Sequence, residues 1–321
     1  MRALFAVAAL IASLLQSTIA KADNYPTKSV RVITSHGPGG LSDVYMRTLA
    51  EGMGPLLGQT VIVENRVGAD GATGARACAA APPDGYTFCI LPDTAVVYNP
   101  LIYPEQQFDP KDRLVPITRV FNLTQVLAAT AAINVKSIDD LIKYTKANPK
   151  TVSYMTPNLA KVAFMNDLNS KFGTDFVRVP FKGGGDAVNA MLANTIQVAA
   201  FGFGNLAALI ETGKIVGLGI DGNMRSPLAP AVPTFKELGY SDEGTPFFGL
   251  FAPVGTPRLI IDRLFDVTRK VAADPKFERV LHGRGMVSVI NTPDEFSKDL
   301  EHERAIALDI IKRSGVYPNI K

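Results

Sequence analysis

Short apolar runs rich in β-branched residues alternate along the chain with longer stretches in which apolar residues recur every three or four positions. Val30–Thr34 is a run of the first kind, and Leu41–Leu57 is a stretch of the second kind. The first pattern predicts strands buried in a sheet, and the second predicts amphipathic helices. Further strands are predicted at Val61–Glu64, Tyr86–Leu91, Val126–Ala129, Thr151–Tyr154, Val177–Val179, Gln197–Phe201, Val216–Gly219 and Phe248–Ala252.

Helices are predicted between these strands. Ser137–Ala147 begins with a residue suited to capping, Ser137, and has Asp139 and Asp140 in the first turn, where they suit the helix dipole. The other predicted helices are Gly71–Ala81, Val162–Lys171, Asp186–Ala193, Leu206–Thr212, Arg258–Ala273 and Pro293–Arg313. This alternation predicts an α/β fold with mostly parallel sheets.

The first 22 residues differ from the rest of the chain. Arg2 precedes the apolar run Ala3–Leu15, and small residues follow, so that Ala20 or Ala22 suits cleavage. This is the pattern of a secretory signal peptide, and the run is shorter than the ~20 residues that cross a bilayer. No cysteine follows it closely that could carry a lipid. We therefore expect an exported protein, with its signal peptide removed.

The composition indicates a folded globular protein. The 321 residues are 47% hydrophobic and 20% charged, with a net charge of +3, which excludes a disordered polyelectrolyte and gives no basic excess for nucleic acid. The length allows two cores of ordinary size, and no Pro/Gly/Ser-rich linker separates two halves. The two cysteines, Cys78 and Cys89, fit either a disulfide, which an exported protein permits, or two small buried side chains.

The segment Ser35–Asp43 carries the most informative local motif. A strand ends, Gly37, Gly39 and Gly40 follow, and a helix begins. Backbone N–H groups at such a helix start suit a carboxylate or phosphate, although a tight strand-to-helix turn accounts for the glycines equally well. Asp43 is expected to complement the helix start. The motif is neither a Walker loop nor a dinucleotide fingerprint.

A second glycine-rich helix start lies in the other half of the chain. Lys182 is followed by Gly183, Gly184 and Gly185, and the alternative here is a flexible turn with a solvated lysine. A ligand held between two lobes would contact two such helix starts, one from each half of the chain.

Ordered motifs along the chain carry a resemblance to a known family. They are Tyr25–Arg31, Gly37–Gly40 with Asp43, Gly58–Arg66, Pro83–Thr87, Asn99–Leu101, Val179–Gly183, Val232–Thr234 and Ala252–Pro257. The chain resembles the Bug or TctC-like receptors, the periplasmic solute-binding proteins of tripartite tricarboxylate transporters. The resemblance implies a type II periplasmic-binding-protein fold, with two lobes joined by two chain crossings. We expect lobe 1 at 23–120 plus 225–321 and lobe 2 at 121–224.

The resemblance also implies a set of ligand-binding positions, and at the first of them, Ser35–Gly40, backbone groups and ordered water hold one carboxylate. The positions are Ser35, His36, Gly37, Gly39, Gly40, Asp93, Thr94, Ala95, Thr156, Pro157, Asn158, Lys182, Gly183, Gly184, Phe201 and Gly202. Two departures from the family pattern are present. Pro157–Ala160 lacks the usual Gly-x-Gly-Ser/Thr stretch, and Gly202 stands where an acidic residue is common.

An enzyme is the alternative class. The sequence contains no G-x-S-x-G elbow, no H-E-x-x-H and no cluster of metal ligands, so that only His36 could act as a base at the cleft. We therefore expect a binding protein without catalytic residues, metal or cofactor. It is expected to act as a monomer that delivers its ligand to membrane permease subunits, with a sensor for a membrane signalling protein as the alternative.

The expected cleft segments also predict the kind of ligand. Ser35–Gly40, Met155–Leu159, Lys182–Gly185 and Phe201–Asn205 contain no Asp or Glu, which leaves Asp93 as the one acidic candidate. A desolvated ammonium needs a carboxylate partner. We therefore expect a ligand with one or two carboxylates and no amine. Phe201 and Phe203 could line the cleft or point into the core.

Overall fold

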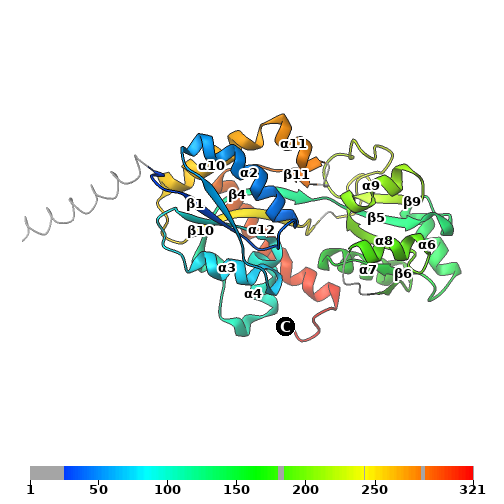
Figure 1. Ribbon diagram of the computed structural model, residues 1–321. Helices are drawn as coiled ribbons and strands as arrows, with labels where there is room; N and C mark the ends of the chain where they lie inside the picture. The colour runs from blue at the N-terminus through cyan, green and yellow to red at the C-terminus, as the bar shows by residue number, and fades with distance from the viewer. Residues whose placement is uncertain (1–24, 180–183, 242, 283–285, 321) are drawn as a thin grey trace, which may run out of the picture.

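The computed structural model describes residues 25–179, 184–241, 243–282 and 286–320. Within them the chain forms two β-sheets, each covered by helices, which lie side by side as a larger and a smaller lobe (Figure 1). The predicted signal peptide, residues 1–22, lies outside the described residues. No helix in the described part of the chain is both long enough and apolar enough to cross a membrane.

The first sheet belongs to the larger lobe. Its strands are β1 (Val30–Thr34), β2 (Val61–Asn65), β3 (Thr87–Pro92), β4 (Leu114–Leu123), β10 (Phe247–Pro253) and β11 (Met286–Ser288), in the order β11-β4-β10-β3-β1-β2. The α-helices of this lobe are α2 (Leu41–Leu57), α3 (Ala72–Ala79), α4 (Asn99–Ile102), α5 (Pro110–Arg113), α10 (Arg258–Ala272), α11 (Pro275–His282) and α12 (Pro293–Ser314). A π-helix at Thr94–Tyr98 follows β3.

The second sheet belongs to the smaller lobe. Its strands are β5 (Gln125–Thr130), β6 (Ser153–Met155), β7 (Val177–Arg178), β8 (Val198–Gly202) and β9 (Ile215–Ile220), in the order β7-β6-β8-β5-β9. Its helices are α6 (Ile138–Ala147), α7 (Leu159–Phe172), α8 (Gly184–Leu192) and α9 (Phe203–Glu211). As predicted, Ser137 caps α6, because its side chain accepts the Asp140 N–H.

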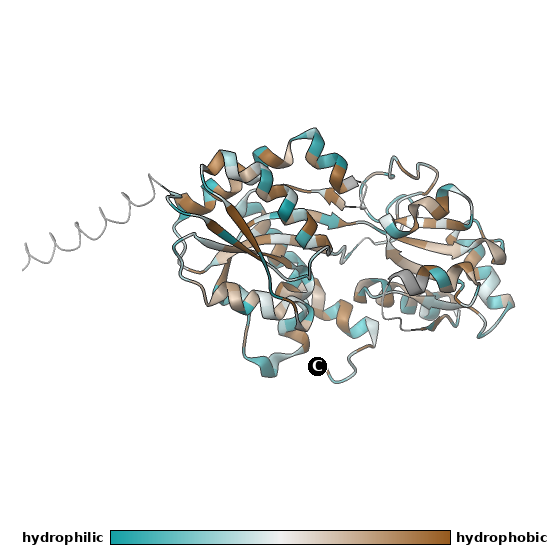
Figure 2. Cartoon of the chain, in the orientation of Figure 1, coloured by the Kyte–Doolittle hydropathy of each residue, from teal (hydrophilic) through white to brown (hydrophobic). Residues whose placement is uncertain are grey.

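Both faces of the first sheet are buried, because successive side chains of a strand point to opposite faces. In β10, Phe248 and Leu250 pack with α2 and α10, whereas Phe247 and Phe251 pack with α3 and α12. Figure 2 shows this arrangement as brown strands inside helices whose outward faces are teal. Each sheet is therefore the centre of two apolar layers.

The chain crosses between the lobes twice. β4 ends at Leu123 and β5 begins at Gln125, and the chain returns between Ile220 and Phe247. On the return, Val232 and Phe235 still pack in the cores of the second sheet, although the sequence prediction assigns this segment to lobe 1. The exact lobe limits stay a prediction.

The expectation of mostly parallel sheets is wrong. β1, β2 and β3 pair in parallel, as do β6, β7 and β8, but β10 is antiparallel to β3 and β4, and β5 is antiparallel to β8 and β9. The reversed strands β5 and β10 adjoin the crossings, so their direction is set by where the chain enters the sheet.

Two further links complete the fold. Cys78 in α3 and Cys89 in β3 form a disulfide with their Cα atoms 6.0 Å apart, which settles the alternatives left open by the sequence. Helix α12 of the larger lobe packs along α7 of the smaller one. At this contact Arg313 pairs with Asp167 at 2.6 Å, and Asn166 donates to the Arg313 carbonyl at 3.0 Å. The two lobes are thus tied beside the crossings.

Candidate functional site

A cavity of about 790 Å³ lies where the two lobes meet. Residues from the ends of β1, β3 and β8 line it, and so do the two crossing segments, through Leu123–Gln125 and Pro246. The cavity is therefore bounded by both sheets and by the segments about which the lobes would move relative to each other.

Half of the predicted ligand-binding positions line this cavity: Ser35, His36, Asp93, Thr94, Pro157, Asn158, Phe201 and Gly202. The others that the structure describes, Gly37, Gly39, Gly40, Ala95, Thr156 and Gly184, do not belong to the lining. Lys182 and Gly183 lie outside the described residues. Of the two phenylalanines, Phe201 lines the cavity, whereas Phe203 is buried in a core of the second sheet.

Four helices begin at the cavity wall. Leu41 opens α2, Gly71 precedes α3, Asn158 precedes α7, and Gly202 precedes α9, and all four residues belong to the lining. Each helix start presents the positive end of a dipole. Some of their N–H groups are already used, because Thr73 of α3 donates to the Gly68 carbonyl and Phe203 of α9 donates to the Thr124 carbonyl. Among the described residues no Lys or Arg lines the cavity. Within the described lining, positive partial charge therefore comes from backbone dipoles.

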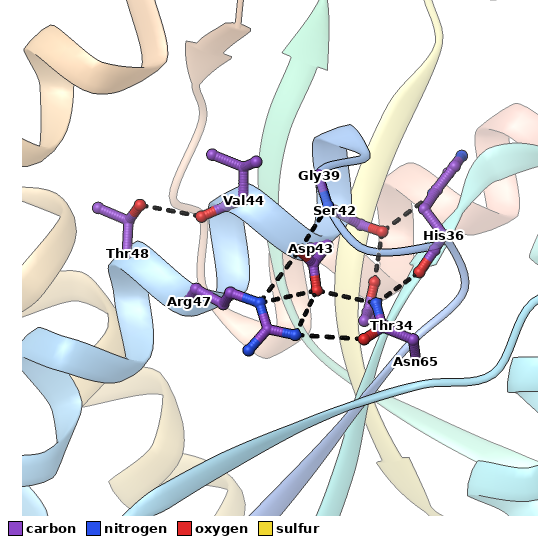
Figure 3. Close-up of polar contacts among 9 residues, drawn as sticks. All are labelled: Thr34, His36, Gly39, Ser42, Asp43, Val44, Arg47, Thr48 and Asn65. Carbon is purple, nitrogen blue, oxygen red and sulfur yellow. Dashed lines mark hydrogen bonds and ion pairs between the residues drawn. The ribbon is translucent and has the colours of Figure 1, made fainter.

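The loop Ser35–Gly40 before α2, called the glycine loop below, is fixed by one buried carboxylate, Asp43 (Figure 3). Its side chain is 2% exposed and accepts the Gly39 N–H at 2.9 Å, Arg47 Nε at 3.0 Å and Asn65 Nδ2 at 2.8 Å. Burial alone would raise the pKa of Asp43, but these hydrogen bonds and the Arg47 charge outweigh it and lower the pKa. Asp43 thus complements the helix start, as the sequence predicts.

The same network corrects one expectation about the glycines. The Gly39 N–H is taken by Asp43, and the Gly40 N–H is donated to the Gly37 carbonyl at 3.0 Å. A Cβ at Gly40 would lie 2.8 Å from His36 Cβ. Glycine is therefore required here for the packing of the loop, and these two N–H groups are not offered to a ligand.

Ser35 and His36 carry the polar side chains of this loop into the cavity lining. Ser35 Oγ is buried and has no hydrogen-bond partner within the described residues. His36 Nδ1 is 2.9 Å from Ser42 Oγ, which in turn contacts Thr34 Oγ1 at 2.5 Å (Figure 3). Burial lowers the pKa of His36 below its ordinary value of 6.5, so the ring is neutral at pH 7. His36 therefore contributes shape and hydrogen bonding, without a positive charge.

Sequence reasoning missed a second loop of the same wall, Val67–Gly71. Ala69 and Asp70 have φ angles of 46° and 48°, in the left-handed region, and Asn99 Nδ2 holds the Ala69 carbonyl at 3.2 Å. A Cβ at Gly71 would meet the Ala95 and Pro92 side chains at 3.0 Å. Gly68 and Gly71 stand just before a helix, and this glycine spacing was the signal from which the loop could have been predicted. The loop adds a second acid, Asp70, to the lining.

The wall from the second sheet is built more locally. Asn158 accepts the Ala160 N–H at 2.8 Å, capping α7, and donates to the Gly244 carbonyl at 3.3 Å. Asn205 Nδ2 donates to the Gly202 carbonyl at 3.3 Å at the start of α9. Both side chains are uncharged.

A buried ion pair lies behind this wall. Lys161 and Asp221, each 3% exposed, pair with each other, and Asp221 Oδ2 also accepts the Gln125 N–H at 3.2 Å. The pair thereby connects α7 to both crossing segments. The sequence reasoning identified neither residue, because nothing in the local pattern shows that a lysine on α7 is buried.

The chemistry of the site is that of binding. Within the described residues no group of three or more His, Cys, Asp or Glu could hold a metal ion. The hydroxyl nearest to His36, that of Ser42, is fully buried and lies outside the lining. The cavity offers helix starts, a free hydroxyl and apolar surface, which suit a small organic anion.

Comparisons with known proteins agree with this geometry. The BugT protein of Bordetella pertussis is 32% identical over 92% of this chain and 91% of the relative. A solved periplasmic transporter structure is 32% identical and covers 92% of this chain and 99% of its own, with a TM-score of 0.74. A Rhodopseudomonas palustris protein solved with adipate is 25% identical over 91% and 98% of the two chains, with a TM-score of 0.75.

The model of the tripartite tricarboxylate transporter family receptor, TctC, matches residues 45–316. The proteins of this family and the structural neighbours are binding proteins for transporters, not enzymes. The match begins within α2 and includes the Val67–Gly71 loop and both crossings. The chain belongs to the TctC family of periplasmic solute-binding receptors.

Proposed function

We propose that this receptor captures a small organic acid with one or two carboxylates and no amine in the cavity between its lobes. It then delivers the acid to the permease subunits of a tripartite tricarboxylate-type transporter. Closure of the lobes about the two crossings is the accompanying motion. Export to the periplasm by the N-terminal signal peptide places the receptor where it meets both ligand and permease.

The observation that carries this proposal is the convergence of four helix starts on a cavity with no described Lys or Arg in its lining. A carboxylate there would be stabilised by the positive ends of these helix dipoles. It would also satisfy Ser35 Oγ, whose buried hydroxyl lacks a partner among the described residues. The relative solved with adipate supports a dicarboxylate as the ligand.

The absence of an amine in the ligand is the finer part of the proposal. The described lining of the cavity has two acids, Asp70 and Asp93, where the sequence indicated one. Neither stands at Gly202, the position at which the family commonly has an acid. A flat or aromatic acid fits beside Phe201 and Phe248, which line the cavity.

A thermal-shift screen tests the proposal, because a ligand that binds only the native state raises the melting temperature. The panel contains adipate, succinate, glutarate, citrate and benzoate, with aspartate and glutamate as the amine-bearing acids. We expect at least one amine-free acid to raise the melting temperature, and calorimetry to give it a tighter Kd than either amino acid. A tighter Kd for aspartate or glutamate would overturn the ligand class, and no shift with any acid would overturn the function.

A matched pair of variants places the acid in the cavity. Ser35 and Thr268 both have a buried hydroxyl without a hydrogen-bond partner in the described residues, but only Ser35 lines the cavity. Neither Ser35→Ala nor Thr268→Val should destabilise the ligand-free protein. Ser35→Ala should weaken binding of the acid by about tenfold or more, the value of a hydrogen bond to a charged group. Equal Kd values for the two variants would move the ligand elsewhere.

A further inference from the structure

Asp93 is the most buried acid of the cavity lining. It stands between β3 and the π-helix at Thr94–Tyr98 and is 8% exposed. Its carboxyl faces the N–H of Thr94, the first residue of that π-helix. A carboxylate that enters this cavity therefore meets the carboxyl of Asp93 within the same enclosed space.

The charges behind Asp93 leave it without a cation of its own in the described part of the chain. Arg119 on β4 is 8% exposed and pairs with Glu303 of α12 at 3.3 Å, with Asp299 of α12 4.0 Å away. Arg119 also donates to Asn122 at 2.7 Å. The guanidinium is thus committed to Glu303, and two buried carboxyls share one positive charge.

Three other titratable groups share this region. Tyr98 lies on the π-helix itself, and burial raises its pKa, so its hydroxyl stays protonated. His36 and Asp70 face the cavity from the loops after β1 and β2. Since burial lowers the pKa of His36, it supplies no positive charge above pH 7. Nothing among these groups neutralises Asp93.

The carboxyl of Asp93 consequently changes between its protonated and ionised forms near neutral pH. Burial raises its pKa to about 7, with a further rise from Glu303, while the Thr94 N–H and Arg119 oppose the increase. A second negative charge in the same cavity raises the pKa of a carboxyl further. A ligand ammonium would lower it. The direction of proton movement on binding thus reports the charge of the ligand that Asp93 meets.

We propose that Asp93 takes up a proton from solvent when the cavity receives a carboxylate, so that the receptor binds its ligand together with a proton. Neutral Asp93 then donates a hydrogen bond to the bound acid and rejects ligands that need a carboxylate partner. Asp93 is thereby a specificity-determining residue. This inference rests on the proposed function, since it requires that a carboxylate occupies the cavity.

Proton counting by calorimetry on the full mature protein tests the proposal. Adipate, succinate and glutarate are titrated in phosphate and in Tris at about pH 8, where Asp93 is mainly ionised before binding and the acids carry fully ionised carboxylates. We expect uptake of about one proton, and a Kd that weakens up to about tenfold per pH unit above pH 7. Binding without uptake, or with proton release, would overturn this inference while the proposed function stands. If no acid of the thermal-shift panel binds, both fail.

Variants of the titratable residues show which residue takes up the proton. Asp93→Asn mimics the neutral form, so it should bind adipate without proton uptake and with a Kd that changes less than about twofold over the same pH range. Asp70→Asn and His36→Gln should each keep the uptake, whereas Glu303→Gln, which frees Arg119 to face Asp93, should reduce it. Uptake that persists in Asp93→Asn and is lost in Glu303→Gln or His36→Gln would place the proton on that other residue and overturn the assignment. The wild-type proton count decides the matter even where a variant fails to fold.

Discussion

The two walls of the cavity are fixed in different ways. On the wall from the first sheet, Asp43 joins Gly39, Arg47 and Asn65, so one carboxylate holds the glycine loop, helix α2 and strand β2 together. On the wall from the second sheet, Asn158 and Asn205 bond mainly to backbone groups two or three residues away. The first wall depends on tertiary hydrogen bonds, and the second depends on the capping of individual helices.

This difference determines what a substitution does. A buried carboxylate with several partners leaves each of them unsatisfied when it is removed. The loss of a helix cap affects one helix end. We therefore expect first-wall substitutions to lower stability and affinity together, and second-wall substitutions to act weakly on both.

The largest effect is expected for Asp43→Ala. Removing the buried carboxylate should lower the free energy of unfolding by about 2–4 kcal/mol and weaken adipate binding by about 100-fold, because the glycine loop loses its fixed position. Chemical denaturation and calorimetry measure the two effects. Asp43→Asn, which keeps an acceptor for the Gly39 N–H, should fall between the two proteins.

The control for Asp43 is Asp262→Ala. Asp262 also pairs with an arginine four residues away in the sequence, Arg258, but both side chains are about half exposed and lie outside the cavity lining. Exposed pairs contribute about 0–1 kcal/mol, and binding should be unchanged. If Asp43→Ala resembled Asp262→Ala, the first wall would not depend on its buried carboxylate.

A smaller effect is expected on the second wall, for Asn158→Ala. Loss of the cap on α7 should cost about 1 kcal/mol of stability and weaken adipate binding a few-fold. Ser137→Ala removes the corresponding cap from α6 in the same lobe, away from the cavity, and should cost the same stability with no change in Kd. A loss of affinity as large as that of Asp43→Ala would show that the two walls do not differ.

The strands and helices with strong periodicity could be predicted from the sequence. Val30–Thr34 and Leu41–Leu57 form the predicted strand and helix with the predicted limits. The apolar run of the strand is bounded by Ser29 and Ser35, and the apolar stripe of the helix is bounded by Gly40 and Gly58. Strand β4, at Leu114–Leu123, was missed, since Pro116 and Arg119 interrupt its apolar pattern. Arg119 is tolerated in a buried strand because Glu303, more than 180 residues later, pairs with it.

The candidate site, like the fold, could be predicted from the sequence only in part. Residues just after buried strands, such as Ser35 and Asp93, could be expected at the cavity because strand ends meet at one edge of a sheet. The left-handed turn at Ala69 and Asp70 could not, since it is held by Asn99 and Thr94 from the following helical segments. Likewise, the use of the Gly39 N–H by Asp43 depends on a tertiary network that the motif does not encode.

The smallest predicted effect is a difference between the two walls in how they make stability depend on pH. Because burial lowers the folded-state pKa of His36, the unfolded chain binds a proton more readily, and stability falls as pH decreases through about 6.5. Asp93 acts in the opposite sense, since its raised pKa lowers stability as pH rises toward 7. The two contributions overlap in wild type, so the difference between wild type and His36→Gln isolates the histidine.

Melting temperatures at about pH 5.5 and 7.5 measure this difference. His36→Gln should lose less stability than wild type on acidification, by a few tenths to about 1 kcal/mol, whereas His302→Gln, at an exposed position on α12, should follow wild type. No titratable histidine, Asp or Glu from the second sheet belongs to the described lining, so this response belongs to the first wall alone. An acid response in His36→Gln identical to that of wild type would mean that His36 titrates as an exposed residue, and the first wall would then be more open to water than its hydrogen bonds to Ser42 indicate.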